Sequence, residues 1–121
     1  MQQNIPPENE IDELDGLCVH FVCLDDQQPI GTARLIPDYD PCNWLGKLGR
    51  FAVIKEFRGM GVGRDIAAAV EVYARDALGL KGLVLHAQLS AEAFYKKLAY
   101  KTEGAPFLEE GIMHVCMRKM L

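Results

Sequence analysis

The sequence predicts a single-domain α/β protein with a mixed sheet, in the element order β-β-β-α-β-α-β-β. Several short segments are rich in β-branched, aromatic or alternating apolar residues and are separated by turn residues, as strands are. Two segments carry apolar residues at spacings of three and four, as helices do. The chain has 121 residues, which is the size of one domain with its own core.

Three strands are expected before the first helix. LCVHFVCL (17–24) and PIGTARLI (29–36) flank the turn DDQQ, so they are expected to form a hairpin. The segment 37–46 contains prolines, aspartates and a glycine, which are typical of a loop. KLGRFAVI (47–54) is a third strand, and it runs directly into a glycine-rich stretch.

Helical periodicity begins after Gly63. One apolar stripe follows at helical spacing and is expected to end at Gly79, as helices often end at glycine. Its members are Ile66, Val70, Tyr73, Ala74, Ala77 and Leu78. GLVLHAQ (82–88) is then predicted as a fourth strand.

A short second helix and two more strands complete the predicted domain. Ser90 is a candidate N-cap for this helix. The apolar residues that share one face of the helix are Ala91, Phe94, Tyr95 and Leu98. YKTEG (100–104) and IMHVCMRKM (112–120) are predicted as the last strands, with APFLEEG between them as a turn region.

Residues 1–15 are expected to be a polar, flexible arm, and residues 16–121 the single domain. The formal net charge is −4 and no basic cluster occurs, which argues against binding to nucleic acid or to an anionic membrane. The N-terminus has no positive region followed by an apolar run, and no apolar segment approaches the roughly 20 residues that span a bilayer. We therefore expect a cytoplasmic protein with no membrane or nucleic-acid partner.

The cysteines indicate neither a metal site nor a disulfide framework. Cys18, Cys23, Cys42 and Cys116 form no CxxC pair and have no histidine at metal-ligand spacing. Unpaired cysteine behaves as a small hydrophobic residue. Free and mostly buried thiols are therefore expected.

The stretch EFRGMGVGRD (56–65) contains three glycines at alternate positions. Between a strand and a helix, such a turn can bind an anion, because unpaired N–H groups point outward and no Cβ atoms block a phosphate. A tight strand-to-helix connection explains the same glycines. Arg64 and Asp65 follow the last glycine, which excludes a P-loop, and Arg64 also breaks a GxGxxG fingerprint.

RGMGVG (58–63) resembles the R/Q-x-x-G-x-G/A signature of the GCN5-related N-acetyltransferases, with Arg58, Gly61 and Gly63 in the defining places. A second block resembles the family's Ala-x-x-x-Tyr-x-x-x-Gly-Phe pattern, whose positions are held by Ala91, Tyr95, Ala99 and Tyr100. The last two depart mildly from it. Residues 86–119 further resemble the small ElaA-like branch. The resemblance extends from about residue 17 to the end.

This resemblance implies a splayed sheet, in which the third and fourth strands separate around the pantetheine arm of acetyl-CoA. The backbone of Phe51, Ala52 and Val53 would then follow the pantetheine, and Gln88 would contact the cofactor. The amides that would wrap the pyrophosphate belong to Arg58, Gly59, Met60, Gly61, Val62, Gly63 and Arg64. The family's reaction requires no metal.

The implied reaction is direct attack of an amine on the thioester. Tyr95 matches the family's acid position, and a phenol with a pKa of about 10 can protonate a thiolate whose conjugate acid has a pKa of about 8.5. Periodicity alone would instead place Tyr95 in the core. The family often takes its base from the third strand, where this chain has Arg50. The candidate bases are His86, Glu103, Glu109, Glu110 and His114, and His114 is preferred because it matches the histidine near the end of the ElaA-like branch.

One departure concerns the N-terminus. The family normally begins with a strand and one or two helices that help to form the acceptor wall, and here these elements are expected to be missing. A fragment, a minimal variant and a wall supplied by a partner subunit all remain open. We predict a homodimer, in which 112–120 pairs or packs across a two-fold axis. The competing explanation is that the loop around Trp44 covers the cleft.

The function predicted first is acetyl-CoA-dependent N-acetyltransfer to an amine of a small molecule or a protein. The alternative is a catalytically idle acyl-CoA-binding module for sensing or assembly. Tyr95 argues for the enzyme, whereas the missing base on the third strand and the missing N-terminal elements argue for the module.

Overall fold

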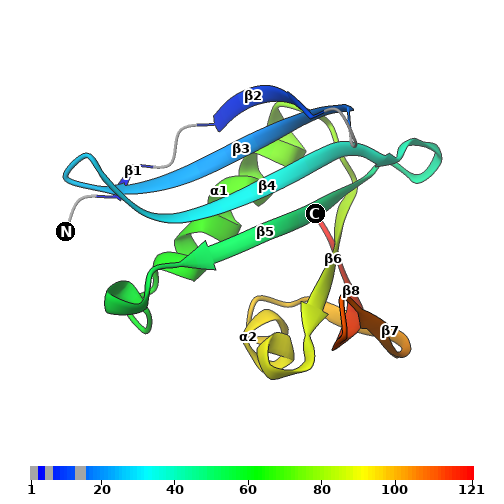
Figure 1. The fold of residues 1–121 in the computed structure, drawn as a ribbon. Coiled ribbons are helices and arrows are strands. Elements are labelled where there is room, and N and C mark those ends of the chain that lie inside the picture. Colours follow the sequence, from blue (N-terminus) through cyan, green and yellow to red (C-terminus); the bar gives the residue numbers. More distant parts are fainter. Residues whose placement is uncertain (1–2, 5–6, 13–15) are drawn as a thin grey trace.

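The computed structural model describes residues 3–4, 7–12 and 16–121. From residue 16 on, its strands and helices follow the predicted order β-β-β-α-β-α-β-β, so the predicted fold class is confirmed (Figure 1). These elements are β3 (Gly16–Asp25), β4 (Gln28–Asp40), β5 (Leu45–Val53), α1 (Val62–Asp76), β6 (Gly82–Gln88), α2 (Glu92–Lys97), β7 (Lys101–Glu109) and β8 (Ile112–Met120).

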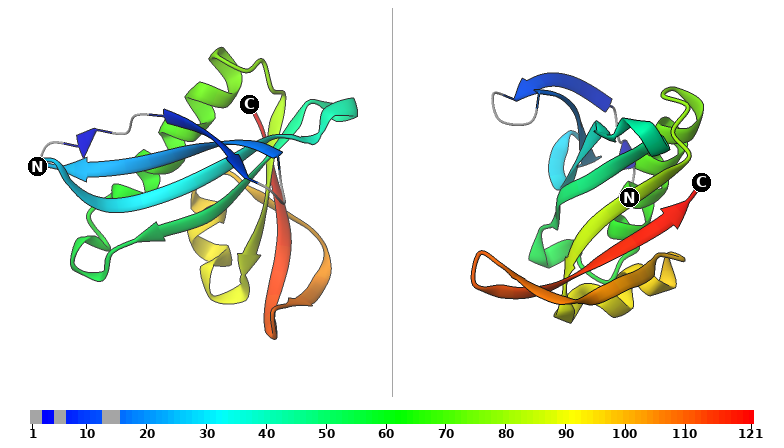
Figure 2. Two further views of the ribbon diagram at one scale, coloured as in Figure 1. Left: turned by 45° about the horizontal axis from the view of Figure 1, so that its top comes forward. Right: turned by 90° about the vertical axis from the view of Figure 1, so that its right-hand side faces the viewer.

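The strands form one mixed sheet in the order β1-β3-β4-β5-β6-β8-β7, and β2 pairs with β3 as well. The pairing of β5 with β6 is parallel, and the other pairings are antiparallel. The sheet is strongly twisted, so the β6–β8–β7 part turns away from the β3–β4–β5 part (Figure 2).

The N-terminal segment differs from the flexible arm that the sequence predicted. β1 (Gln3–Asn4) and β2 (Pro7–Asp12) both pair with β3, and β2 does so from Pro7 opposite Phe21 to Asp12 opposite Gly16. The sequence did not predict β2 because its residues are polar. An edge strand can form backbone hydrogen bonds without an apolar face. In the described part of the chain ahead of β3 there are thus strands and no helix.

Two tight hairpins fix the register of the sheet. Asp26 and Gln27 connect β3 to β4, and Glu110 and Gly111 connect β7 to β8. All four residues have positive φ, from 49° to 77°. Such two-residue turns match the twist of the paired strands.

The core lies between the sheet and the two helices. One apolar cluster contains residues of α1, residues of β3, β4, β5, β6 and β8, Tyr95 of α2 and Tyr100. Of the predicted apolar stripe, Ile66, Val70 and Ala74 are buried, Tyr73 and Leu78 are partly buried and Ala77 is exposed. Val62 and Ala67 of α1 are also buried. Glu71 on the same helix accepts a hydrogen bond from Lys119 Nζ at 2.7 Å, which ties α1 to β8.

β5 and β6 pair along only part of their length. Their parallel register runs from Leu45 opposite Gly82 to Leu48 opposite Leu85 and then stops, although β5 continues to Val53 and β6 to Gln88. The two strands diverge beyond this point (Figure 1). This divergence is the splayed sheet that the sequence resemblance implied.

Several local predictions need correction. β4 continues through Asp40, four residues into the predicted loop, and β7 continues through Glu109 into the predicted turn region. Ser90 lies within a 3-10 turn (Leu89–Ala91), and Ala91 takes the N-cap position of α2 without a side-chain hydrogen bond. The strand extensions at 37–40 and 105–109 contain polar and proline residues, which usually end strands. Pairing with a neighbouring strand overrides that local preference.

The four cysteines are free thiols, as predicted, with Cys18 and Cys23 buried, Cys116 partly buried and Cys42 exposed. Over the described ranges, no three histidine, cysteine or acidic side chains gather as metal ligands. Among the described helices, none is long and apolar enough to cross a membrane.

Candidate functional site

A cleft of about 910 Å³ opens where β5 and β6 diverge. One wall consists of β5 and the turn that follows it, and the opposite wall of β6, α2 and the end of the β7–β8 hairpin. The lining residues are Leu48, Gly49, Arg50, Phe51, Ala52, Val53, Phe57, Arg58, Gly59, Gly63, Leu85, His86, Ala87, Gln88, Ser90, Ala91, Phe94, Tyr95, Glu110 and His114. Beyond Leu48 and Leu85, the edges of β5 and β6 that face each other are not paired with one another.

The glycine-rich stretch forms the turn between β5 and α1. Gly59 and Gly61 have φ values of 79° and 81°, a conformation that disfavours residues with a Cβ. Gly63 is required for a different reason, because a Cβ there would lie 2.9 Å from the ring of Phe94. Gly61 is also the N-cap of α1 and supplies no side-chain hydrogen bond, so the first N–H groups of the helix are not capped by that residue.

The structure brings most of the predicted cofactor residues to the cleft. Phe51, Ala52 and Val53 line it from β5, and Gln88 lines it from the exposed end of β6. From the glycine turn, Arg58, Gly59 and Gly63 line it.

Four other predicted cofactor residues are not among the residues that line the cleft, namely Met60, Gly61, Val62 and Arg64. Val62 is buried in the core and Arg64 is largely exposed beside Asp65. A contact of Val62 with a ligand would therefore involve its backbone, as the sequence resemblance implied.

Arg58 and Arg50 shape the β5 wall. The Arg58 Nε donates a hydrogen bond of 3.1 Å to the carbonyl of Val53, which fastens the turn to the end of the strand. Arg50 lies at a bulge where the β4–β5 register shifts, and its φ is 47°. The Thr32 hydroxyl donates to the Arg50 carbonyl at 3.3 Å. Such bulges redirect side chains, and no local pattern in the sequence predicted this one.

Tyr95 belongs to both the core and the cleft. Its ring packs edge-on against Phe51, Phe94 and Tyr100, with centroid distances of 5.8, 5.0 and 6.0 Å. Burial raises the pKa of its phenol to about 12. Tyr95 is therefore neutral near pH 7, with its hydroxyl proton in place.

Three of the five candidate bases lie together on the wall that faces β5. His86 Nδ1 lies 3.0 Å from Glu109 Oε1, and His114 Nε2 lies 3.6 Å from Glu109 Oε2. His114 Nδ1 lies 2.7 Å from the carbonyl of Ile112. The hydrogen bond with His86 is the main cause that lowers the pKa of Glu109, so this carboxyl is ionised at neutral pH.

The other two candidate bases are placed differently. Glu103 forms an ion pair with Arg118 at 2.9 Å and is not among the residues that line the cleft. Glu110 lines the cleft from the β7–β8 turn and is exposed. The sequence named all five residues, but it gave no signal that Glu109 would lie between two histidines.

Comparisons with known proteins relate this sequence to one family. A family model described as the acetyltransferase (GNAT) domain matches residues 4–121. The uncharacterized N-acetyltransferase YjcF of Bacillus subtilis (strain 168) is 40% identical over 119 residues, which cover 98% of this chain and 81% of YjcF.

Two solved structures show the shared fold. Escherichia coli ElaA superposes with a TM-score of 0.76 at 22% identity, over 91% of this chain and 74% of ElaA. An aminoglycoside 6'-N-acetyltransferase complexed with coenzyme A superposes with a TM-score of 0.74 at 16% identity, over 85% of this chain and 72% of that protein.

Proposed function

This chain belongs to the GNAT acetyltransferases, as the sequence predicted, and from that membership we propose that it transfers the acetyl group of acetyl-CoA to an amine. The observation that carries the proposal is the cleft between the diverging ends of β5 and β6. It runs from the glycine turn to Tyr95 and His114, so most of the residues predicted for cofactor binding and both residues predicted for chemistry line one cavity. A protein of the same fold has been solved with coenzyme A bound.

The proposed cofactor site uses backbone groups of β5 and of the glycine turn. The β5 edge at Phe51–Val53 has no strand partner on the β6 side, so backbone groups there are available to the amides of a pantetheine arm, apart from the Val53 carbonyl that accepts from Arg58 Nε. The α1 N-terminus, with Gly59 and Arg58 beside the cleft, suits the negatively charged pyrophosphate. We propose backbone contacts for Met60, Gly61, Val62 and Arg64 and a side-chain contact for Gln88.

The proposed chemistry is a direct attack of the amine nitrogen on the thioester carbon. Tyr95 is proposed as the acid, and it supplies a hydrogen bond to the sulfur as negative charge develops there. Because the pKa of Tyr95 is about 12, its phenolate is a strong base. When Tyr95 gives its proton to sulfur, the phenolate therefore takes a proton from the attacking nitrogen. The base is proposed to lie on the opposite wall, where the sequence favoured His114.

The acceptor is proposed to be an amine of a small molecule or of a protein. The test is release of free thiol from acetyl-CoA with a panel of spermidine, kanamycin, a peptide with a free N-terminus and a peptide with an internal lysine. We expect at least one of these amines to accelerate thiol release over the rate without amine. Coenzyme A binding by calorimetry without turnover of any amine would favour the idle acyl-CoA-binding module.

We further propose that the protein acts in the cytoplasm as a homodimer. Four free thiols are typical of a reducing compartment. The dimer is supported by the exposed apolar side chains at the β7–β8 hairpin, Leu108, Ile112 and Met113.

A further inference from the structure

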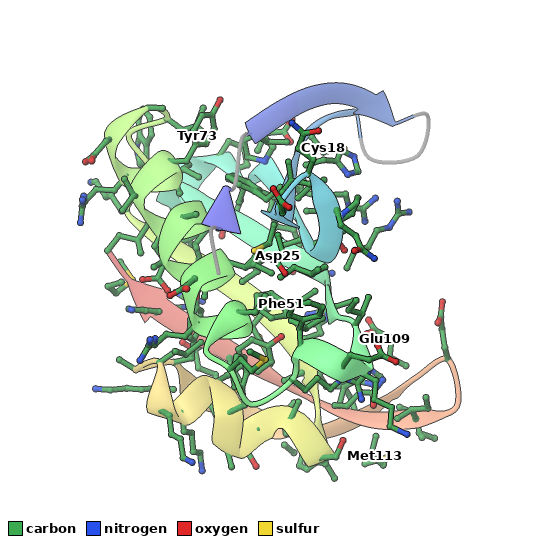
Figure 3. The ribbon with its side chains drawn as sticks, turned by 90° about the vertical axis from the view of Figure 1, so that its left-hand side faces the viewer. Cys18, Asp25, Phe51, Tyr73, Glu109 and Met113 are labelled. Atoms are coloured by element: carbon green, nitrogen blue, oxygen red, sulfur yellow. The ribbon has the colours of Figure 1, made fainter. Side chains whose placement is uncertain are left out.

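Glu109 lies between two histidines that line the proposed acetyl-transfer cleft. His86 comes from β6, Glu109 from β7 and His114 from β8, and β8 pairs with both neighbouring strands. In the view of Figure 3, Glu109 is labelled on the side of the molecule away from α1. Phe107 packs against both imidazole rings, with centroid distances of 5.1 Å to His86 and 6.2 Å to His114.

The partners of the two rings define which nitrogen carries the proton. An ionised carboxylate and a backbone carbonyl only accept hydrogen bonds. His86 Nδ1 must therefore donate to Glu109, and His114 Nδ1 must donate to the carbonyl of Ile112. In the neutral form of each ring, Nε2 then carries the lone pair that can accept a proton.

The two Nε2 atoms differ in their surroundings. His114 Nε2 faces Glu109 Oε2 at 3.6 Å, and the His114 side chain is 10% exposed. His86 is 21% exposed, and no hydrogen bond to its Nε2 is found within the described residues. Of the two imidazoles, His86 thus has the ring nitrogen that is available to a molecule in the cleft.

We propose that His86 Nε2 takes the proton from the acceptor ammonium, and that Glu109 is the positioning residue that holds the His86 ring and stabilises its charged form. This inference rests on the proposed acetyltransferase function. It replaces the preference for His114 as the base, because His114 Nε2 faces Glu109 Oε2 at 3.6 Å. A histidine is suited to this role because imidazole exchanges protons near neutral pH.

Each proton and electron pair of the proposed transfer has a defined destination. An N–H bond of the ammonium breaks, His86 Nε2 binds the proton, and the nitrogen keeps the electron pair that attacks the thioester carbon. The C–N bond forms as the C–S bond breaks, and sulfur keeps that electron pair. Sulfur takes the Tyr95 proton, and the phenolate takes the second proton of the nitrogen. His86 then releases its proton to water, so the products are an amide, coenzyme A and one proton.

Other charged and titratable groups surround this cluster. Lys47 of β5 interacts with Glu109, and Arg50 and Glu110 line the same cleft. Tyr95 faces the cleft from α2, and Cys116 of β8 pairs across from His86. Burial raises the pKa of Cys116, so its thiol is neutral at pH 7. Variants are therefore needed to distinguish a pH dependence caused by His86 from one caused by these other groups.

The first experiment needs no acceptor. The pH titration of the His86 ring is followed by ¹⁵N NMR in the wild-type protein and in Glu109→Gln, which keeps a hydrogen-bond acceptor but removes the charge. We expect the titration midpoint to move to lower pH in the variant, because the charged ring loses its carboxylate. An unchanged midpoint in a folded variant would overturn the role of Glu109, whether or not the protein is an acetyltransferase.

The second experiment follows kcat/KM against pH with the most active amine of the four-member panel. For His86→Gln we expect kcat/KM to fall about 10²–10⁴-fold. We also expect the acid limb of the profile, which is the fall in kcat/KM at low pH, to disappear. For Glu109→Gln we expect a smaller loss, with the acid limb shifted to lower pH. His114→Gln tests the other candidate base and should keep the limb.

Calorimetry with coenzyme A and circular dichroism check that each variant is folded and still binds the cofactor. If His114→Gln abolishes the limb while His86→Gln keeps it, the base is His114 and the proposal is wrong. If no amine of the panel reacts with the wild type, the proposed function fails for these acceptors, and the NMR titration still decides the His86–Glu109 coupling.

Discussion

At the scale of single residues, Tyr95 both packs in the core and lines the cleft, whereas the sequence presented a core position and a place in the site as alternatives. Its ring contacts three aromatic neighbours in the core, and the residue also lines the cleft. Packing fixes the ring, and a fixed ring holds its hydroxyl in one place. A residue can therefore be part of the core and still supply a proton, because preorganised donors need no reorganisation during the reaction.

Replacement of Tyr95 by phenylalanine tests the acid role. Tyr95→Phe keeps the ring and its contacts and removes the hydroxyl, so we expect turnover to fall about 10²–10⁴-fold with little change in coenzyme A affinity. Steady-state kinetics and calorimetry measure the two quantities. Because the pKa of Tyr95 is about 12, its ionisation should cause no loss of rate up to about pH 10. Equal turnover of variant and wild type, with chemistry rate-limiting, would leave Tyr95 with a packing role alone.

At the scale of elements, local patterns in the sequence predicted the strands, the helices and the glycine turn. Strand β6 and the stripe of α1 could be read directly, because each repeats an apolar pattern over several residues. β2 and the end of β7 could not, since their polar residues form strands only through pairing with β3 and β8. The His86–Glu109–His114 arrangement could not be predicted either, because it depends on the register of three paired strands.

The glycine turn provides a test with an internal control. Gly61→Val places a β-branched residue at a φ of 81°, and Gly79→Val does so at a φ of 66° beyond the other end of α1. Each substitution should cost about 1–3 kcal/mol of stability, measured by chemical denaturation. We expect only Gly61→Val to weaken coenzyme A binding, by tenfold or more in calorimetry, since only that turn is proposed to bind the pyrophosphate. Equal affinities in the two folded variants would remove the cofactor from this turn.

At the scale of the whole molecule, the structure shows that the predicted homodimer cannot form through β8 as an edge strand. β8 does not lie at an edge of the sheet, because it pairs with β6 on one side and β7 on the other. Trp44 does not cover the cleft either, since it precedes the paired part of β5 and its carbonyl accepts a hydrogen bond from the Lys81 N–H. Among the described strands, β7 is an edge strand, and it pairs with β8 alone.

The homodimer prediction can therefore be stated for a definite surface, the β7–β8 hairpin. Leu108, Ile112 and Met113 are 69, 47 and 39% exposed there, next to the unpaired edge of β7, and Figure 3 shows Met113 near the hairpin. Apolar side chains beside a free edge favour association through a two-fold axis. We expect light scattering at micromolar concentration to give a dimer mass for the wild type and a monomer mass for Leu108→Glu. Val72→Glu is the control, because Val72 is 49% exposed on α1 and should leave the dimer intact. A monomeric wild type with full activity would show that the cleft works without a second subunit, and the hairpin would then need another explanation for its exposed apolar residues.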